Sequence, residues 1–164
     1  MDLSAYKLPD DDLRRSSYSR AISSAARLFA FSNTKWPELL LPDALRQIDD
    51  ELLSCALNLR RVLEREPKPF QQVKAHWSSL TGTPKEKYDH DLWRIMGRIV
   101  HHMVMKPIIL SDPKFFAGAT GYLVCDLEVE SDNGVSLISI AGFAIAAANE
   151  LGKSLKKSSK SEPK

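Results

Sequence analysis

The chain has 164 residues, a formal net charge of +2 and 43% hydrophobic residues, which is the ordinary composition of one globular domain. No apolar run has the length of a membrane span, and the polar, acidic N-terminus does not have the pattern of a secretory signal. The two cysteines, Cys55 and Cys125, lie far apart, which excludes a disulfide framework and a four-thiolate zinc site. We therefore expect a protein with no membrane segment in a reducing, cytoplasmic setting.

Two amphipathic helices are predicted in the first part of the chain. The first begins near Asp10, because aspartate is a good N-cap, and it stops at Ser32-Asn33 before Pro37. The second begins at Pro42, a favoured first-turn residue, and ends before Pro67 and Pro69. Apolar residues recur at steps of three and four in both. The stripes are Leu13, Ala21, Ile22, Ala25, Leu28 and Phe29, then Leu45, Ile48, Leu52, Ala56, Leu59 and Leu63.

Two further helices are predicted between residues 70 and 107. A short one covers residues 70–80, where Phe70, Val73, Trp77 and Leu80 share a face. A long one begins at Thr83-Pro84-Lys85-Glu86, which has the pattern of a capping box with proline at the first position. It ends before Pro107, and a loop with two prolines and two glycines follows. Its apolar face is Tyr88, Leu92, Ile95, Ile99 and Met103.

A β-hairpin at about residues 122–140 and an Ala-rich helix from Gly142 to Leu155 are predicted next. Asn133-Gly134 is a strong signal for a two-residue turn, which would place Val129 opposite Ile138 and Leu127 opposite Ile140. The alternation buries Leu123, Cys125, Leu127 and Val129 and leaves Val124, Asp126, Glu128 and Glu130 on a solvated face. The expected fold is thus mainly α, a four-helix-type bundle with the hairpin inserted before the last helix. Residues 1–155 form one domain, and residues 156–164 are a basic, disordered tail.

One charged stripe on the predicted long helix is able to support chemistry. At about 100° per residue, Arg94 and His101 lie within roughly 20° of each other, with Lys87, His90 and Arg98 on or near the same side. Arginine can hold a phosphate by two parallel hydrogen bonds, and histidine exchanges protons near neutral pH. On RNA, His101 would act on the ribose 2′-hydroxyl or the leaving oxygen, and Arg94 would stabilise the charge on the phosphate.

The segment from Arg94 to His101, an arginine and a histidine separated by six residues, resembles the R-x4-6-H motif of HEPN domains (higher eukaryotes and prokaryotes nucleotide-binding). That family consists of small helical bundles, many of them metal-independent ribonucleases of toxin–antitoxin and defence systems. The resemblance implies that Arg94 and His101 are the catalytic pair. It also implies a homodimer, RNA as substrate and an antitoxin as protein partner. The residue after the arginine, usually polar in the family, is the apolar Ile95 here.

Two other interpretations stay open. A charged stripe opposite an apolar one is also the ordinary pattern of a helix at the protein surface. Alternatively, the chain is a noncatalytic interaction module that binds a protein through the edge of the hairpin or the helix surface around Trp93. No cofactor is indicated. No metal site is indicated either, because the adjacent His101 and His102 point to different sides of a helix.

Overall fold

The computed structural model describes residues 10–64 and 81–158. The predicted helix over residues 70–80 therefore lies outside the described residues. The elements are α1 (Asp10–Phe31), β1 (Lys35–Pro37), the 3₁₀ turn η2 (Glu38–Leu40), α2 (Leu41–Leu63), the 3₁₀ turn η3 (Lys85–Lys87), α3 (Leu92–Val100), β2 (His102–Phe116), β3 (Ala119–Ser131), β4 (Gly134–Ser139) and α4 (Ile140–Ser158). The fold is mainly helical, as expected, with a four-stranded antiparallel sheet, and a four-helix bundle with an inserted hairpin is not confirmed.

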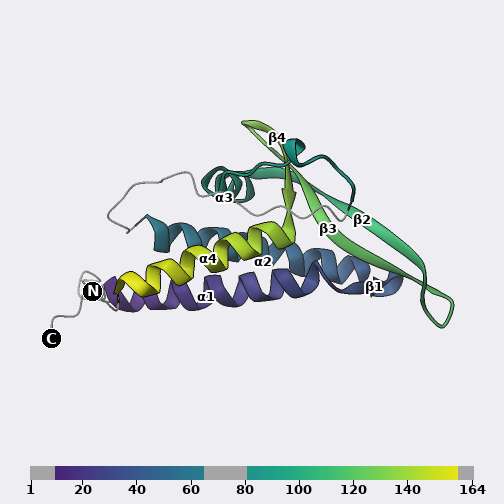
Figure 1. The fold of residues 1–164 in the computed structure, drawn as a ribbon, viewed down its shortest axis with the longest axis horizontal. Helices are drawn as coiled ribbons and strands as arrows, with labels where there is room; N and C mark the ends of the chain where they lie inside the picture. Colours follow the sequence, from purple (N-terminus) through teal and green to yellow (C-terminus); the bar gives the residue numbers. More distant parts are fainter. Residues whose placement is uncertain (1–9, 65–80, 159–164) are drawn as a thin grey trace, which may run out of the picture.

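The helices α1, α2 and α4 form one layer, and β2, β3 and α3 lie over it (Figure 1). The predictions for α1 and α2 are confirmed, including Pro42 in the first turn of α2. The buried centre of α1 is a stripe of small residues, and Ser24 and Ala21 contact α2 through Ser54 and Cys55. Two members of the predicted stripe are not buried: Leu13 is 42% exposed and Phe29 is 46% exposed. Among the described residues, no helix is long and apolar enough to cross a membrane.

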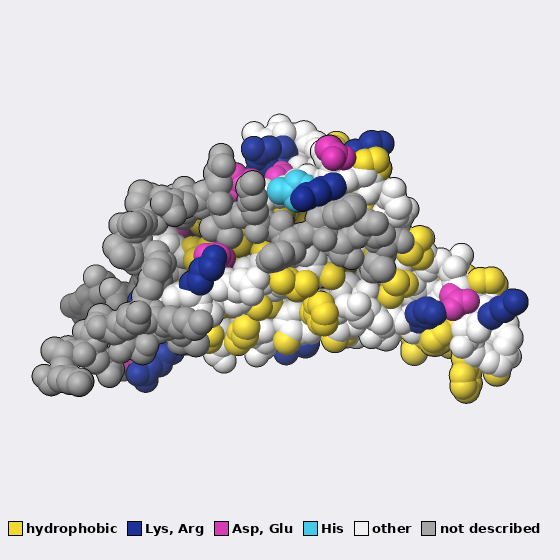
Figure 2. Space-filling view, viewed as in Figure 1, with side chains coloured by type: hydrophobic (Ala, Val, Ile, Leu, Met, Phe, Trp, Pro, Cys, Tyr) yellow, Lys and Arg dark blue, Asp and Glu magenta, His cyan; other side chains and the backbone are white. Residues whose placement is uncertain are grey.

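The sheet centres on β3. It pairs with β2 along one side, and with β1 and then β4 along the other, always antiparallel. The paired strands β2 and β3 extend beyond the helical layer as a two-stranded arm (Figure 1). Hydrophobic side chains are visible at the end of this arm (Figure 2), where Phe116 is 74% exposed.

The long helix predicted from Thr83 to Pro107 is wrong. Only η3 forms near the capping-box pattern, with no side-chain cap, and α3 starts at Leu92, nine residues after Thr83. The cause is a tertiary contact: Tyr88 forms a bridge with Leu137 of β4, and the Asp89 N–H donates to the Leu137 carbonyl at 2.9 Å. An extended backbone there excludes a helix.

The residues predicted as the end of that helix and a loop form the 15-residue strand β2 instead. Pro107 and Pro113 were interpreted as breakers, but an edge strand tolerates proline because it needs no donor on its open side. Met103, predicted to face the core on a helix, is 60% exposed on this strand. The edge is the physical reason that proline did not end the strand.

The predicted hairpin exists, but its register differs by two residues. Leu127 pairs with Ile138, and Val129 pairs with Ser136. The turn residues are Asp132 and Asn133, and the positive φ of 97° belongs to Gly134 after the turn. A shift of two residues keeps every side chain on its predicted face, so Leu127, Val129, Ile138 and Ile140 are all buried as expected.

A β-bulge changes which residues of β3 face the core. Ile108 pairs with Asp126 and Ile109 pairs with Val124, so Cys125 is the extra residue. Val124, predicted to face solvent, is therefore in the core. Asp126, also predicted to be solvated, is 1% exposed, because Tyr88 packs on that face and donates to its carboxylate at 2.8 Å.

The last helix is confirmed and runs longer than predicted. It covers Ile140–Ser158, so the first three residues of the predicted disordered tail are helical. The remaining residues of that tail, 159–164, lie outside the described part of the chain. Cys55 and Cys125 are both buried, and burial raises the pKa of the Cys55 thiol to about 12.

Candidate functional site

A hollow of about 380 Å³ lies beside α3 and the β3–β4 turn. The structure brings three of the predicted site residues, Arg94, Arg98 and His101, to this one hollow. Its remaining lining comes from Trp93, Gly97 and Asn133. Two guanidinium groups and an imidazole at one concave surface form a chemical environment suited to an anion.

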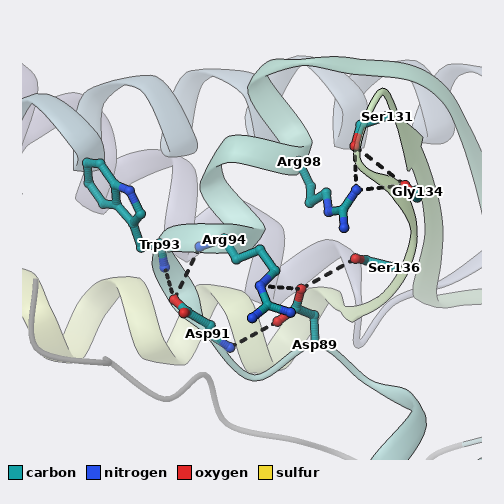
Figure 3. Close-up of polar contacts among 8 residues, drawn as sticks. All are labelled: Asp89, Asp91, Trp93, Arg94, Arg98, Ser131, Gly134 and Ser136. Carbon is teal, nitrogen blue, oxygen red and sulfur yellow. Dashed lines mark hydrogen bonds and ion pairs between the residues drawn. The ribbon is translucent and has the colours of Figure 1, made fainter.

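Asp91 sets the start of α3 and therefore the placement of the site. Its carboxylate oxygen Oδ1 accepts from the backbone N–H groups of Trp93 at 3.0 Å and Arg94 at 3.2 Å (Figure 3). This is the side-chain cap that the sequence pattern had assigned to Thr83. From Asp91 onward the helical spacing places Arg94, Arg98 and His101 along one side of a single helix.

Arg94 has an acidic neighbour in Asp89. The Nε of Arg94 lies 3.8 Å from Asp89 Oδ2, which is an ion-pair distance longer than a hydrogen bond. The Asp89 side chain is only 8% exposed, and it accepts from the Asp91 N–H at 3.1 Å and the Ser136 hydroxyl at 3.3 Å (Figure 3). The Arg94 side chain is 62% exposed, so its guanidinium faces both this carboxylate and solvent.

Arg98 is held by the turn between β3 and β4. Its Nη1 donates to the Ser131 hydroxyl at 2.7 Å and to the Gly134 carbonyl at 2.8 Å (Figure 3). Its Nε is buried and has no hydrogen-bond partner among the described residues. Arg98 thus joins α3 to the hairpin, and this structural role was not predicted.

His101 stands at the C-terminal end of α3. Its N–H donates to the Gly97 carbonyl at 3.1 Å, which completes the last turn, and its side chain is exposed. An exposed imidazole on the rim of the hollow is accessible to a bound substrate. The neighbouring His102 starts β2 and does not border this hollow.

Two predicted site residues do not join the hollow. Lys87 belongs to the exposed turn η3, and His90 precedes α3, where its Nε2 donates to the Lys85 carbonyl at 2.8 Å. They were placed on the stripe by assuming a continuous helix from Thr83, which the extended segment at Tyr88 and Asp89 rules out. Asp89 was missed for the same reason, because only the tertiary contact with β4 brings it beside Arg94.

Trp93 is half-buried and packs against the core. Its ring points away from Arg94 and Arg98 (Figure 3), and the Arg60 guanidinium lies 4.8 Å from the ring centroid. The side chain predicted as a partner contact is therefore already covered on one face by a cation.

Among residues 10–64 and 81–158, no group of three or more histidine, cysteine or acidic side chains is arranged to hold a metal ion. Comparisons with protein-family models, with curated proteins and with solved structures found no match for this chain.

Proposed function

We propose that this protein binds RNA through the hollow beside α3 and cleaves it without a metal ion. The observation that carries the proposal is the meeting of Arg94, Arg98 and His101 at one concave surface. Arg94 would hold a phosphate by two parallel hydrogen bonds, and its exposure leaves it accessible for this role.

Cleavage requires the histidine as well as the arginine. His101 would accept the proton of a ribose 2′-hydroxyl, whose oxygen attacks the adjacent phosphorus as the 5′-oxygen leaves. Arg94 would stabilise the negative charge that develops on the phosphate. The products would be a 2′,3′-cyclic phosphate and a 5′-hydroxyl, with a proton from water or a second copy completing the leaving group. The HEPN-like interpretation, with a homodimer and an antitoxin partner, stays part of this proposal.

The binding test uses fluorescence anisotropy with a short single-stranded RNA at several salt concentrations. We expect Arg94→Ala to weaken binding about tenfold at low salt and to reduce the slope of log affinity against log salt by about 0.7. The matched control is Arg46→Ala, because Arg46 also has an acidic partner, Asp43 at 2.8 Å, but does not border the hollow. Equal losses for both variants would contradict the proposed site.

The cleavage test incubates purified protein with RNA in EDTA. We expect wild type to cleave, and His101→Ala and Arg94→Ala to lose cleavage while keeping the wild-type circular dichroism spectrum. His90→Ala is the control histidine, because it lies outside the hollow. Binding without cleavage would reduce the proposal to an RNA-binding protein. Equal cleavage by wild type and His101→Ala would assign the activity to another site or a contaminant.

The alternative, an interaction module that adds a strand at the hairpin edge, has less structural support. The β4 edge is partly covered by the bridge from Tyr88 and the Asp89 N–H. The open edge of β2 carries Pro107 and Pro113, and prolines at an edge oppose the pairing of another strand.

A further inference from the structure

A second hollow of about 380 Å³ lies between α2 and the start of β2, separate from the residues proposed to bind RNA. Its floor is formed by the buried side chains Ile48, Leu52 and Leu127. Leu45, Met103, Met105 and Pro107 complete an apolar lining. Three polar side chains border it: Arg46, Asp49 and His102. A mostly apolar concavity with a few converging polar groups is the usual form of a small-molecule site.

The imidazole of His102 is held in one orientation. Its Nδ1 lies 2.6 Å from the Ile99 carbonyl oxygen, and because a carbonyl only accepts, Nδ1 carries the hydrogen. In the neutral ring, Nε2 is then the acceptor, and it lies 3.8 Å from Asp49 Oδ1. Two acceptors cannot bond each other, because neither carries a hydrogen, but a donor placed between them can reach both.

The charges around the hollow favour a cation over an anion. Asp49 is a carboxylate beside His102, so an anionic head group placed here would be repelled. Arg46 is the one cation among the side chains lining this hollow, and its Nη2 donates to Asp43 at 2.8 Å. Together, the two carboxylates of Asp43 and Asp49 and the guanidinium of Arg46 therefore carry a net negative charge.

We propose that this hollow binds a small amphipathic amine, with the apolar tail over Ile48, Leu52 and Leu127. The ammonium group lies between Asp49 and His102, donating to the carboxylate and to Nε2. This site is independent of the RNA proposal, because none of its lining residues borders the hollow beside α3.

The test is isothermal titration calorimetry of the full chain with octylamine, octanoate and octanol, each below its aggregation concentration. We expect one octylamine per chain, with octanol and octanoate binding at least about tenfold more weakly, since hydrogen bonds to charged groups are the stronger ones. Asp49→Asn is expected to remove the preference for the amine over the alcohol. Asp50→Asn, a matched change at the next residue of the same helix, which does not line the hollow, is expected to alter affinity less than about twofold.

A second measurement locates the ligand in the wild-type protein. With ¹³C-labelled methionine methyl groups, octylamine should shift the signals of Met103 and Met105 and leave that of the buried Met96 in place. Three outcomes would overturn the proposal: no binding of octylamine, tighter binding of octanoate, or binding that leaves Met103 and Met105 unchanged. An equal loss of affinity in Asp49→Asn and Asp50→Asn would do so too.

Discussion

The Tyr88 hydroxyl donates a hydrogen bond of 2.8 Å to the Asp126 carboxylate, and both side chains are buried. Thr81 extends this contact, because its hydroxyl lies 3.0 Å from that of Tyr88. Burial raises the pKa of Asp126, and the hydrogen bonds from Tyr88, Thr81 and Ser139 oppose that rise without cancelling it. The hydrogen-bond donors around the carboxylate therefore only partly compensate for the water that it loses on burial.

This raised pKa predicts that Asp126 makes the protein less stable as the pH rises. The folded state binds the proton more tightly than the unfolded state, so the free energy of unfolding falls as the pH passes from the unfolded pKa to the folded one. In Asp126→Asn the side chain is neutral at every pH, and this contribution is absent. Urea denaturation from about pH 4 to about pH 8 should therefore show a variant that gains on wild type as the pH rises. A constant difference across this range would contradict the raised pKa.

Loss of the Arg98 side chain should loosen the β3–β4 turn. Arg98→Ala removes both hydrogen bonds that join α3 to Ser131 and Gly134, and we expect the free energy of unfolding to fall by about 1–2 kcal/mol. Arg98→Lys should recover only part of this loss, since an ammonium group lacks the guanidinium fork. Denaturation gives the stability, and faster amide exchange in Gly134–Ser139 would locate the effect. Unchanged exchange there would show that Arg98 does not hold the turn.

Gly121 should not tolerate a larger residue. A Cβ at this position would lie 2.7 Å from the Cβ of Phe115, which packs across it on the neighbouring strand. We expect Gly121→Ala to lower the free energy of unfolding by about 1–3 kcal/mol through overpacking. Gly152→Ala in α4 is the control, because a Cβ there has nothing within 4 Å, and it should stabilise the helix by about 0.5–1 kcal/mol. The same sign for both changes would argue against the contact with Phe115.

The N-cap at Asp91 should matter for stability. Asp91→Ala leaves the N–H groups of Trp93 and Arg94 without their side-chain acceptor, which should cost about 1 kcal/mol. Asp91→Asn keeps an acceptor oxygen, so it should lower the free energy of unfolding by only a few tenths of a kcal/mol. Thermal denaturation of the two variants separates capping from the loss of charge. If both lose stability equally, charge rather than the cap is responsible.

Asp89 should restrain RNA binding at the candidate site. Asp89→Asn removes a negative charge 3.8 Å from Arg94 Nε and keeps an acceptor oxygen for Ser136. If Arg94 binds phosphate, RNA affinity should rise by about two- to tenfold at low salt and converge with wild type at high salt. Anisotropy titrations check this, and a fall in affinity with intact folding would instead make Asp89 a residue that positions Arg94.

Local sequence patterns were sufficient to predict the helices α1, α2 and α4 and the buried residues Leu127, Val129, Ile138 and Ile140 of the hairpin. Each has a periodic apolar stripe or a turn signal within a short segment, and local geometry translates such patterns directly into buried faces. The same helical spacing indicated that Arg94, Arg98 and His101 would share one side, which the short helix α3 is sufficient to produce.

Contacts between distant parts of the chain set the other features. The bridge between Tyr88 and Leu137 replaced a locally favoured helix with extended chain, and so removed Lys87 and His90 from the site. The prolines of β2 were compatible with a strand only because β2 lies at the edge of the sheet. The bulge at Cys125 and the burial of Asp126 depend on partners distant in the sequence. The physical reason is common to all of these: long-range pairing supplies hydrogen bonds and packing that a local pattern does not contain.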